Sequence, residues 1–168
     1  MNNEIYDLAA KTVRLLNDNK LHISTAESCT GGLLSAYITA VPGSSAVFET
    51  GAATYSVDSK NRILGVSGET LAKHGAVSPE TAAEMARCVR NLAGADIGVS
   101  VTGVAGPDGS EGHMPGLVFI ALDDKCGVTV KKLEIEPLGR EYVRETAVRE
   151  LLTLVIKTVG KYSQEGNC

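Results

Sequence analysis

The sequence contains no long uninterrupted run of hydrophobic residues. A membrane-spanning helix needs roughly 18 consecutive apolar residues, and no stretch of this chain approaches that length. The N-terminal segment MNNEIYDLAAKTVRLL places acidic residues before basic ones and has no apolar core, unlike a secretory signal peptide. We therefore expect a protein that is not associated with a membrane and lies in the cytoplasm.

Cysteine and histidine are too few and too dispersed for a metal site. The four cysteines form no C-x-x-C pair, and the three histidines share no short motif. Such spacing fits neither a disulfide framework nor a zinc site. We expect a reducing compartment and a function that needs no metal or other cofactor. The cysteines are Cys29, Cys88, Cys126 and Cys168.

Positive charge is not in excess either. The chain has 16 Lys and Arg against 20 Asp and Glu, a net charge of −4, and Lys131-Lys132 is its only basic doublet. Nucleic-acid binding relies on basic patches, so we expect no nucleic-acid partner. With 43% hydrophobic and 21% charged residues over 168 positions, the composition suits one globular domain spanning residues 1–168.

Hydrophobic periodicity predicts strands that alternate with helices. Two strands follow one another late in the chain. This order predicts an α/β fold, a three-layer α/β/α sandwich on a mixed, mostly parallel sheet, with ligands bound where strands end and helices begin. The predicted helices are 4–18, 31–38, 56–64, 79–94 and 139–159, and the predicted strands are 22–26, 48–55, 97–102, 117–122 and 128–135.

The helix over 79–94 has the strongest local signals. Ser78 suits the N-cap and Pro79 the first turn. A hydrophobic stripe follows at helical spacing, and we expect the sheet to cover it. The stripe consists of Ala82, Met85, Ala86, Val89, Leu92 and Ala93.

The segment TAESCTGG is a candidate nucleophile turn between a strand and a helix. A serine such as Ser28 becomes nucleophilic when a neighbouring base takes its proton. Backbone N–H groups at a helix start can hold a developing oxyanion, and Gly31 and Gly32 would let a substrate approach the backbone closely. The alternative is that Ser28 or Thr30 simply caps the helix.

Lys60 is the candidate base. If 57–64 is helical, Lys60 projects from the middle of an apolar face and Arg62 points the opposite way. Burial lowers the pKa of a lysine and yields a neutral amine. The alternative is that its stem covers apolar surface while the ammonium reaches water. The expected apolar face consists of Val57, Ile63 and Leu64.

Two further segments could bind a substrate. The glycine-rich run from Thr102 to Gly109 follows a predicted strand but matches neither a Walker A nor a dinucleotide motif. Its glycines, Gly103 among them, permit backbone contacts to a sugar or phosphate, or form a structural turn. Arg140 and Arg144, one turn apart at the start of the last helix, suit a phosphate, or pair with Glu141 and Glu145.

Cys29 is an alternative nucleophile because it neighbours Ser28. A thiolate would need a histidine, which His74 or His113 could supply. His74 lies just before the 79–94 helix, in a predicted loop. Free cysteines are more often small core residues, so we favour Ser28.

Several motifs in one order resemble the CinA C-terminal domain family of competence/damage-inducible proteins. Within it, the chain looks closest to the stand-alone nicotinamide-nucleotide amidohydrolases called PncC, and the shared pattern covers nearly the whole sequence. The motifs are TAESCTGG (25–32), PGSSAVF (42–48), TYS-x-x-x-K (54–60), HGAVS (74–78), TG-x-AGPDG (102–109) and G-R-x-x-V-R (139–144).

The resemblance implies hydrolysis of nicotinamide mononucleotide to nicotinate mononucleotide and ammonia, without a metal. It makes Ser28 the nucleophile, Lys60 its base and Tyr55 an assisting residue. It also implies three substrate or site contacts, which are Ser45, Thr102 and Arg140.

The chain departs from the family pattern in two segments. Where the family tends to show Lys-Pro-Val-Gly-Thr-Val, residues 113–118 read HMPGLV, so any role of that lysine or threonine is lost. Where many relatives have Gly-Asp-Arg, residues 138–140 read LGR, which changes the expected phosphate contacts. Larger family members carry an N-terminal molybdopterin-binding-like domain with pyrophosphatase activity, and that activity is not expected here.

These inferences combine into one reaction with one alternative. We expect the phosphate near Arg140 and the carboxamide at the start of the 31–38 helix, where Lys60 deprotonates Ser28. The alternative is a non-catalytic module of the same fold that binds pyridine nucleotides or a protein partner. A homodimer or higher homo-oligomer is expected for a small α/β enzyme.

Overall fold

The computed structural model describes residues 2–165, so Cys168 lies outside the described residues. The helices are α1 (Asn3–Asp18), α2 (Leu33–Thr39), α3 (Val57–Ser59), α4 (Gly68–His74), α5 (Pro79–Ala93) and α6 (Arg140–Glu165), with a 3₁₀ turn η1 (Ser44–Ala46) and a π-helical turn η2 (Lys60–Leu64). The strands are β1 (Ile23–Glu27), β2 (Phe48–Ala53), β3 (Ile97–Gly103), β4 (Leu117–Asp124) and β5 (Gly127–Glu134).

The five strands form one mixed sheet in the order β2-β1-β3-β4-β5. Strand β1 pairs in parallel with β2 and β3, whereas β4 pairs antiparallel with β3 and β5. Four strands therefore point the same way and β4 alone is reversed. This arrangement confirms the predicted α/β fold on a mixed, mostly parallel sheet.

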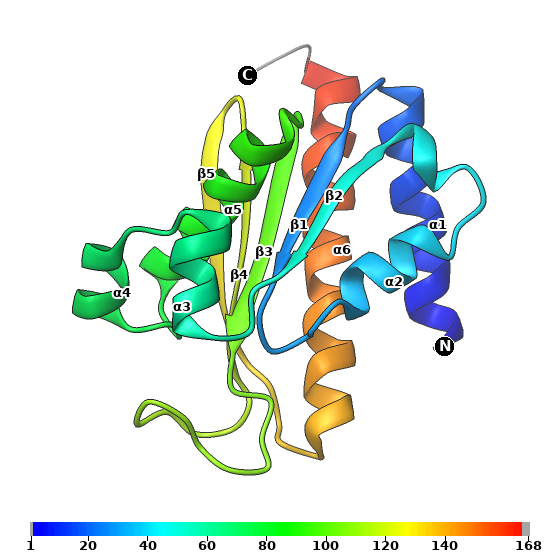
Figure 1. The fold of residues 1–168 in the computed structure, drawn as a ribbon. Coiled ribbons are helices and arrows are strands. Elements are labelled where there is room, and N and C mark those ends of the chain that lie inside the picture. The colour runs from blue at the N-terminus through cyan, green and yellow to red at the C-terminus, as the bar shows by residue number, and fades with distance from the viewer. Residues whose placement is uncertain (1, 166–168) are drawn as a thin grey trace.

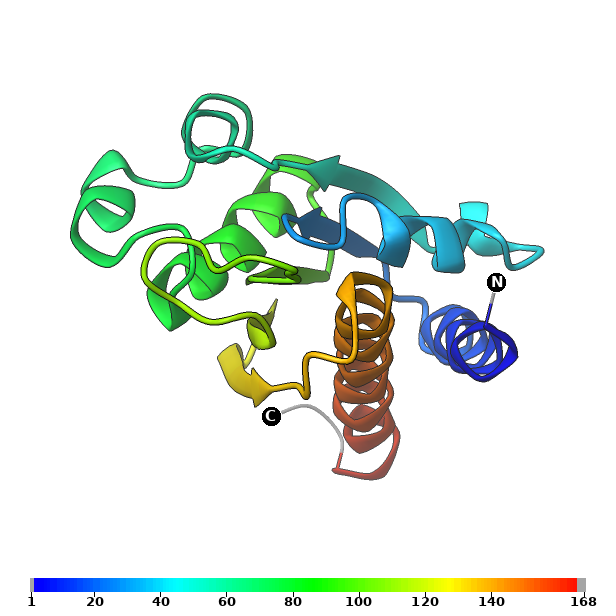
Figure 2. The same cartoon turned by 90° about the horizontal axis from the view of Figure 1, so that it is seen from below.

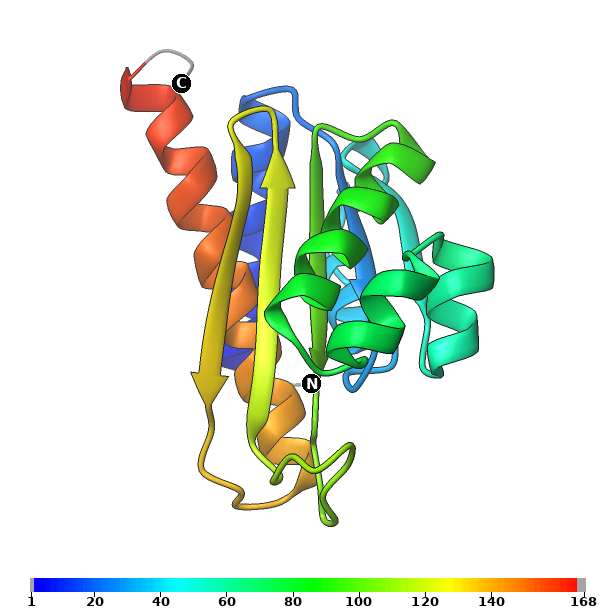
Figure 3. The ribbon, with the colours of Figure 1, turned by 90° about the vertical axis from the view of Figure 1, so that its left-hand side faces the viewer.

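Helices cover both faces of the sheet, as Figure 1 and the perpendicular view in Figure 3 show. Helices α1, α2 and α6 lie on one face, and α5 lies on the other with α3 and α4 beyond it. Helix α5 packs closely because β3 carries Gly98, where a Cβ atom would come within 2.1 Å of the Ala86 carbonyl oxygen. Every strand that approaches the site is thus held between two helical layers.

Helix α5 confirms the predicted helix over 79–94, including its N-cap and most of its buried stripe. Ser78 is the N-cap and its side chain accepts from the Thr81 amide, with Pro79 in the first turn. Leu92 is an exception, since it is 59% exposed. The buried part of the predicted stripe consists of Ala82, Met85, Ala86 and Val89.

Three other predictions of helices are corrected. Residues 31 and 32 lie outside α2, because Gly31 and Gly32 adopt left-handed φ values of 58° and 97° that turn the chain before the helix begins. Helix α4 was not predicted, and His74 is its last residue rather than part of a loop. Helix α6 is longer than predicted and extends to Glu165.

The segment around Lys60 is helical, but its apolar face differs from the prediction. Val57 and Ile63 are 47% and 65% exposed, and only Leu64 of the expected face is buried. The chain winds as one short turn of α-helix and then as a π-helical turn from Lys60 to Leu64. The wider turn changes the residue spacing, so Lys60 and Leu64 face inward while Arg62 points to solvent as predicted.

Candidate active site

The candidate site lies at the end of the sheet where three parallel strands finish. Glu27, the last residue of β1, pairs with Ala53 of β2 and with Val101 of β3. Carboxyl ends of parallel strands meet at one edge, so Ser28 and Thr54 follow their strands at the same place. This edge is the lower end of the sheet in Figure 1, where α6 also begins, and Figure 2 looks onto it.

Ser28 and Lys60 are in direct contact. The Lys60 Nζ atom lies 2.8 Å from Ser28 Oγ and 2.8 Å from the carbonyl oxygen of Thr54. Lys60 has no exposed surface and Ser28 is 8% exposed. The snorkelling alternative for Lys60 is therefore wrong: the ammonium is buried against a hydroxyl and a carbonyl, and does not reach water.

The surroundings of Lys60 favour its neutral form. Burial lowers the pKa of the Lys60 ammonium from 10.5 to about 8, against a smaller opposing effect of Cys29 and Glu111. A charged amine loses its hydration shell on burial, and this loss favours release of the proton. Near pH 8, a substantial fraction of Lys60 can accept a proton from the adjacent hydroxyl.

The Glu27 carboxylate occupies the start of α2. It accepts hydrogen bonds from the amides of Gly32, Leu34 and Ser35 at 2.9–3.1 Å and from the Ser35 hydroxyl at 2.7 Å. A carboxylate at a helix start is stabilised by the unpaired amides and the helix dipole. These amides were expected to hold an oxyanion, and that expectation is wrong because Glu27 already occupies them.

The turn after Ser28 offers other donors. The Thr30 amide donates to no other described residue, and the Thr30 hydroxyl is buried without a partner. The Ser28 amide, by contrast, donates to the Val101 carbonyl at 2.9 Å, which joins the turn to β3. The Cys29 amide, directly after Ser28, also donates to no other described residue, and of Thr30 and Cys29 it is Cys29 that lines the pocket.

A pocket of about 290 Å³ opens beside this pair. It is lined by six of the ten predicted site residues, by Asp108 of the predicted glycine-rich run, and by Glu111, which was not predicted. The six are Ser28, Tyr55, Lys60, Thr102, Gly103 and Arg140.

Ser45 is not part of the pocket in this chain. It lies in η1, just before β2. Because β2 runs parallel to β1 and Phe48 pairs with Ile23 at the start of that strand, Ser45 lies at the opposite end of the sheet from Ser28. The resemblance placed it in the site, and the topology of the sheet separates the two.

Gly31 and Gly32 do not line the pocket either. A Cβ atom at either position would meet no protein atom within 4 Å, so close approach of another chain segment is not what requires these glycines. Their left-handed φ values require them. Gly103 does line the pocket, but a Cβ there would lie 2.5 Å from the Leu117 carbonyl oxygen, so the approach of β4 explains this glycine.

The two arginines at the start of α6 have different roles. Arg140 donates to the Tyr55 hydroxyl and to the Gly106 carbonyl oxygen, each at 2.6 Å, and lines the pocket. Arg144 donates to the Thr30 carbonyl oxygen at 2.6 Å and does not line it. The predicted phosphate contact of Arg144 is thus replaced by a tether to the Ser28 turn, and neither arginine pairs with its neighbouring glutamate.

Thr102 and Glu111 hold the same peptide of the pocket wall. The fully buried Thr102 hydroxyl donates to the Ala76 carbonyl at 2.7 Å, and the Glu111 carboxylate accepts from the Ala76 and Val77 amides at 2.8 and 3.3 Å. Thr102 therefore positions the wall. Glu111 was missed because nothing in its local pattern shows that the loop after β3 folds back onto residues 76 and 77.

Cys29 is poorly placed to act as a nucleophile. It is 5% exposed, and burial raises the pKa of its thiol to about 11. His74 lies 3.6 Å from Glu80, and neither His74 nor His113 lines the pocket. The thiol therefore stays protonated at neutral pH and has no histidine to activate it.

Two wider properties complete the description of the molecule. No group of three or more His, Cys, Asp or Glu side chains within residues 2–165 is arranged to hold a metal ion. In the same part of the chain, no helix is both long and apolar enough to cross a bilayer.

The fold and the site define an α/β protein with a buried serine–lysine pair at the carboxyl edge of its sheet. The family model described as CinA C-terminal domain matches residues 5–159. The chain belongs to the CinA C-terminal domain family.

Known proteins of similar sequence support this assignment. A competence-damage inducible protein of Acetivibrio thermocellus is 46% identical over 156 residues, which cover 92% of this chain and 38% of that protein. A CinA-like protein of Geobacter metallireducens is 50% identical over 119 residues, or 70% of this chain and 29% of that protein. The chain thus spans well under half the length of these relatives.

Solved structures share the fold over nearly the full chain. The competence/damage inducible protein CihA from Agrobacterium tumefaciens has a TM-score of 0.88 at 39% identity, covering 94% of this chain and 96% of that one. A CinA superfamily protein from Klebsiella pneumoniae has a TM-score of 0.90 at 33% identity, covering 96% and 99%. The three-layer architecture is therefore that of the CinA superfamily.

Proposed function

We propose that the chain is an amidohydrolase that converts nicotinamide mononucleotide to nicotinate mononucleotide and ammonia. The observation that carries this proposal is the 2.8 Å contact between Lys60 Nζ and Ser28 Oγ in a buried position. A serine needs an adjacent base to attack a carbonyl carbon, and a buried amine with a pKa of about 8 is such a base. The family resemblance of the motifs around both residues supplies the substrate.

The first half of the reaction forms an acyl-enzyme. Neutral Lys60 takes the Ser28 proton as Oγ bonds to the carboxamide carbon, and the carbonyl electrons move to oxygen. Cys29 directly follows Ser28 and lines the pocket, and its amide donates to no other described residue, so it is the candidate donor to this oxyanion. When the oxyanion collapses, the carbon–nitrogen bond breaks and the protonated Lys60 gives its proton to the departing ammonia.

The second half returns the enzyme to its starting state. Water gives a proton to neutral Lys60 while its oxygen attacks the acyl carbon. The ester bond to Ser28 Oγ then breaks, Lys60 returns the proton to Oγ, and the carboxylic acid leaves. The Thr54 carbonyl accepts a hydrogen bond from Lys60 Nζ and keeps it aimed at Ser28 throughout.

The rest of the pocket suits a small nucleotide. Its volume of about 290 Å³ is at the lower end of the range for small-molecule sites. Arg140 is fastened to Tyr55 and Gly106, and its guanidinium provides a charge for the phosphate. Tyr55 is 62% exposed beside Arg140, so its ring can contact the substrate from the solvent side.

The experiment that tests this function measures ammonia release from nicotinamide mononucleotide, free nicotinamide and other pyridine nucleotides. The wild-type chain should act on the mononucleotide, Ser28→Ala should abolish turnover, and Cys29→Ala should retain it. Ammonia release by Ser28→Ala at the wild-type rate would rule out the mechanism. Calorimetric binding of the mononucleotide without turnover by the wild type would favour the non-catalytic binding module instead.

Location and assembly belong to the same proposal. A reaction on a soluble pyridine nucleotide suits the cytoplasm, and we propose a homodimer or higher homo-oligomer. Fractionation and light scattering test these two points independently of the assay.

A further inference from the structure

Glu111 presents a carboxylate to the pocket with half of its hydrogen-bonding capacity unused. Its Oε2 atom accepts from the amides of Ala76 and Val77, at 2.8 and 3.3 Å. Its Oε1 atom has no partner among the described residues. Glu111, Ala76 and Val77 all line the pocket beside Ser28 and Lys60. One oxygen thus anchors the side chain, and the other is available to a ligand.

The backbone holds this carboxylate in a defined place. Glu111 has a left-handed φ of 51°, and residues 110 and 113 on either side of it are joined by a pair of backbone hydrogen bonds of 3.1 and 2.9 Å. The Ala76 peptide that Glu111 contacts is held from its other side by Thr102. Because both ends of the contact are fixed, the carboxylate is a preorganised part of the wall.

The pocket therefore combines fixed charges of both signs. The guanidinium of Arg140 is fastened to Tyr55 and Gly106, and the carboxylate of Glu111 is fastened to the 76–77 peptides. Lys60 and Asp108 are the other charged residues that line it. A ligand that carries both an anionic group and a cationic group would complement this pocket better than a ligand with an anionic group alone.

Resting on the proposed function, we propose that Glu111 is the specificity residue that selects carboxamides carried on a cationic ring. In nicotinamide mononucleotide this ring is the pyridinium, and the phosphate is the anionic group. The electrostatic effect of Glu111 on Lys60 agrees with its position in the pocket, because Glu111 acts to raise the pKa of that amine. The same field that stabilises a protonated Lys60 stabilises a ring cation.

The test compares two ligands that differ in ring charge. Oxidised and reduced nicotinamide mononucleotide share the carboxamide, ribose and phosphate, but the reduced ring is neutral. Calorimetry on Ser28→Ala protein measures both dissociation constants without turnover. Adding Glu111→Gln should weaken binding of the oxidised form about tenfold and change binding of the reduced form by less than about twofold.

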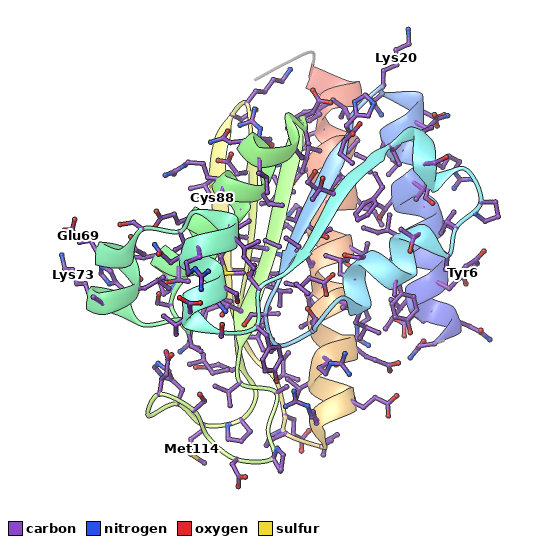
Figure 4. All side chains as sticks on the ribbon, viewed as in Figure 1. Tyr6, Lys20, Glu69, Lys73, Cys88 and Met114 are labelled. Carbon is purple, nitrogen blue, oxygen red and sulfur yellow. The ribbon has the colours of Figure 1, made fainter. Side chains whose placement is uncertain are left out.

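The glutamine variant separates charge from structure. Its side-chain oxygen can still accept from the Ala76 and Val77 amides, so the wall keeps its anchor while the charge is lost. Glu69→Gln is the matched control, because Glu69 lies on α4 with its side chain directed away from the sheet (Figure 4). This control should leave both dissociation constants unchanged.

Three outcomes decide the matter. Equal weakening of both ligands by Glu111→Gln, or no weakening of either, would overturn the selection by charge. If that variant does not fold, both dissociation constants are measured on Ser28→Ala protein at increasing salt concentration. The preference for the oxidised form should then shrink, and a preference that stays constant would overturn the proposal. Wild-type protein that binds with this preference but releases no ammonia would refute the deamidation and leave the role of Glu111 standing.

Discussion

Arg144 in α6 donates a hydrogen bond of 2.6 Å to the carbonyl oxygen of Thr30, 114 positions earlier in the chain. The turn that carries Ser28 is thereby fastened to the helix that also supplies Arg140. The Nε atom of Arg144 is buried without a hydrogen-bond partner among the described residues, while the terminal nitrogen donates to Thr30. Arg144 does not line the pocket, so it affects the site by holding the Ser28 turn in place.

Replacing Arg144 by methionine should lower kcat about tenfold and leave KM nearly unchanged. The methionine keeps most of the apolar stem but no longer holds the Thr30 carbonyl, so the Ser28 turn loses its alignment with Lys60. Steady-state kinetics with nicotinamide mononucleotide measure the effect. Arg149→Met is the control, since Arg149 lies on the same helix and forms an ion pair with Glu4 at 3.8 Å, away from the pocket lining. A rise in KM with constant kcat would indicate a substrate contact instead.

The rate should depend on pH through Lys60. Its pKa in the folded protein is about 8, lowered mainly by burial, and only the neutral amine can take the Ser28 proton. We expect kcat/KM to rise about tenfold per pH unit below pH 8 and to level off above it. Lys60→Arg should be inactive at every pH because a guanidinium stays protonated. A flat profile between pH 6 and pH 9 would contradict a Lys60 base.

Stability should depend on the buried carboxylate of Glu27. The Glu27 carboxylate accepts hydrogen bonds from Gly32, Leu34 and Ser35. Glu27→Gln keeps one acceptor oxygen, but its NH₂ group then faces some of these donors and cannot accept from them. We expect a loss of about 3 kcal/mol in the free energy of unfolding, measured by urea denaturation, together with a loss of activity. Glu49→Gln, at an exposed position on β2, should cost less than about 0.5 kcal/mol. Equal stabilities of the two variants would refute the capping role.

Ser45→Ala should leave the activity of an isolated chain within about twofold of wild type. Ser45 is exposed and lies at the far end of the sheet from Ser28, and surface substitutions have small effects. Ammonia assays alongside light scattering test this expectation. A large loss that appears only in an oligomeric sample would show that a second copy brings its own Ser45 to the pocket.

The departure from the family pattern at residues 113–118 falls on the loop between β3 and β4. Met114 is 77% exposed there, and Figure 4 shows it below the end of the sheet. Neither His113 nor Met114 lines the pocket, whereas Ser110 and Glu111 of the same loop do. The altered residues thus lie outside the pocket, next to the part of the loop that forms its wall.

Local sequence patterns were sufficient for the strands, for most of the helices and for the central pair, although they missed α4. Alternating hydrophobic segments determined the α/β class, because burial of one face is encoded at a period of two or 3.6 residues. Ser28 and Lys60 each stood out in a short motif. The prediction that Lys60 points inward was right although Val57 and Ile63 are exposed, since Leu64 and a π-helical turn orient it.

Only the tertiary structure decided which polar groups are already occupied. Glu27 accepts hydrogen bonds from the amides at the start of α2. Arg144 donates to the Thr30 carbonyl, and Thr102 donates to the Ala76 carbonyl. The parallel run of β1 and β2 separates Ser45 from Ser28, and the folded-back loop brings in Glu111. Except for those of Glu27, these hydrogen bonds join residues far apart in the chain, so they depend on how the elements pack, and no local periodicity encodes them.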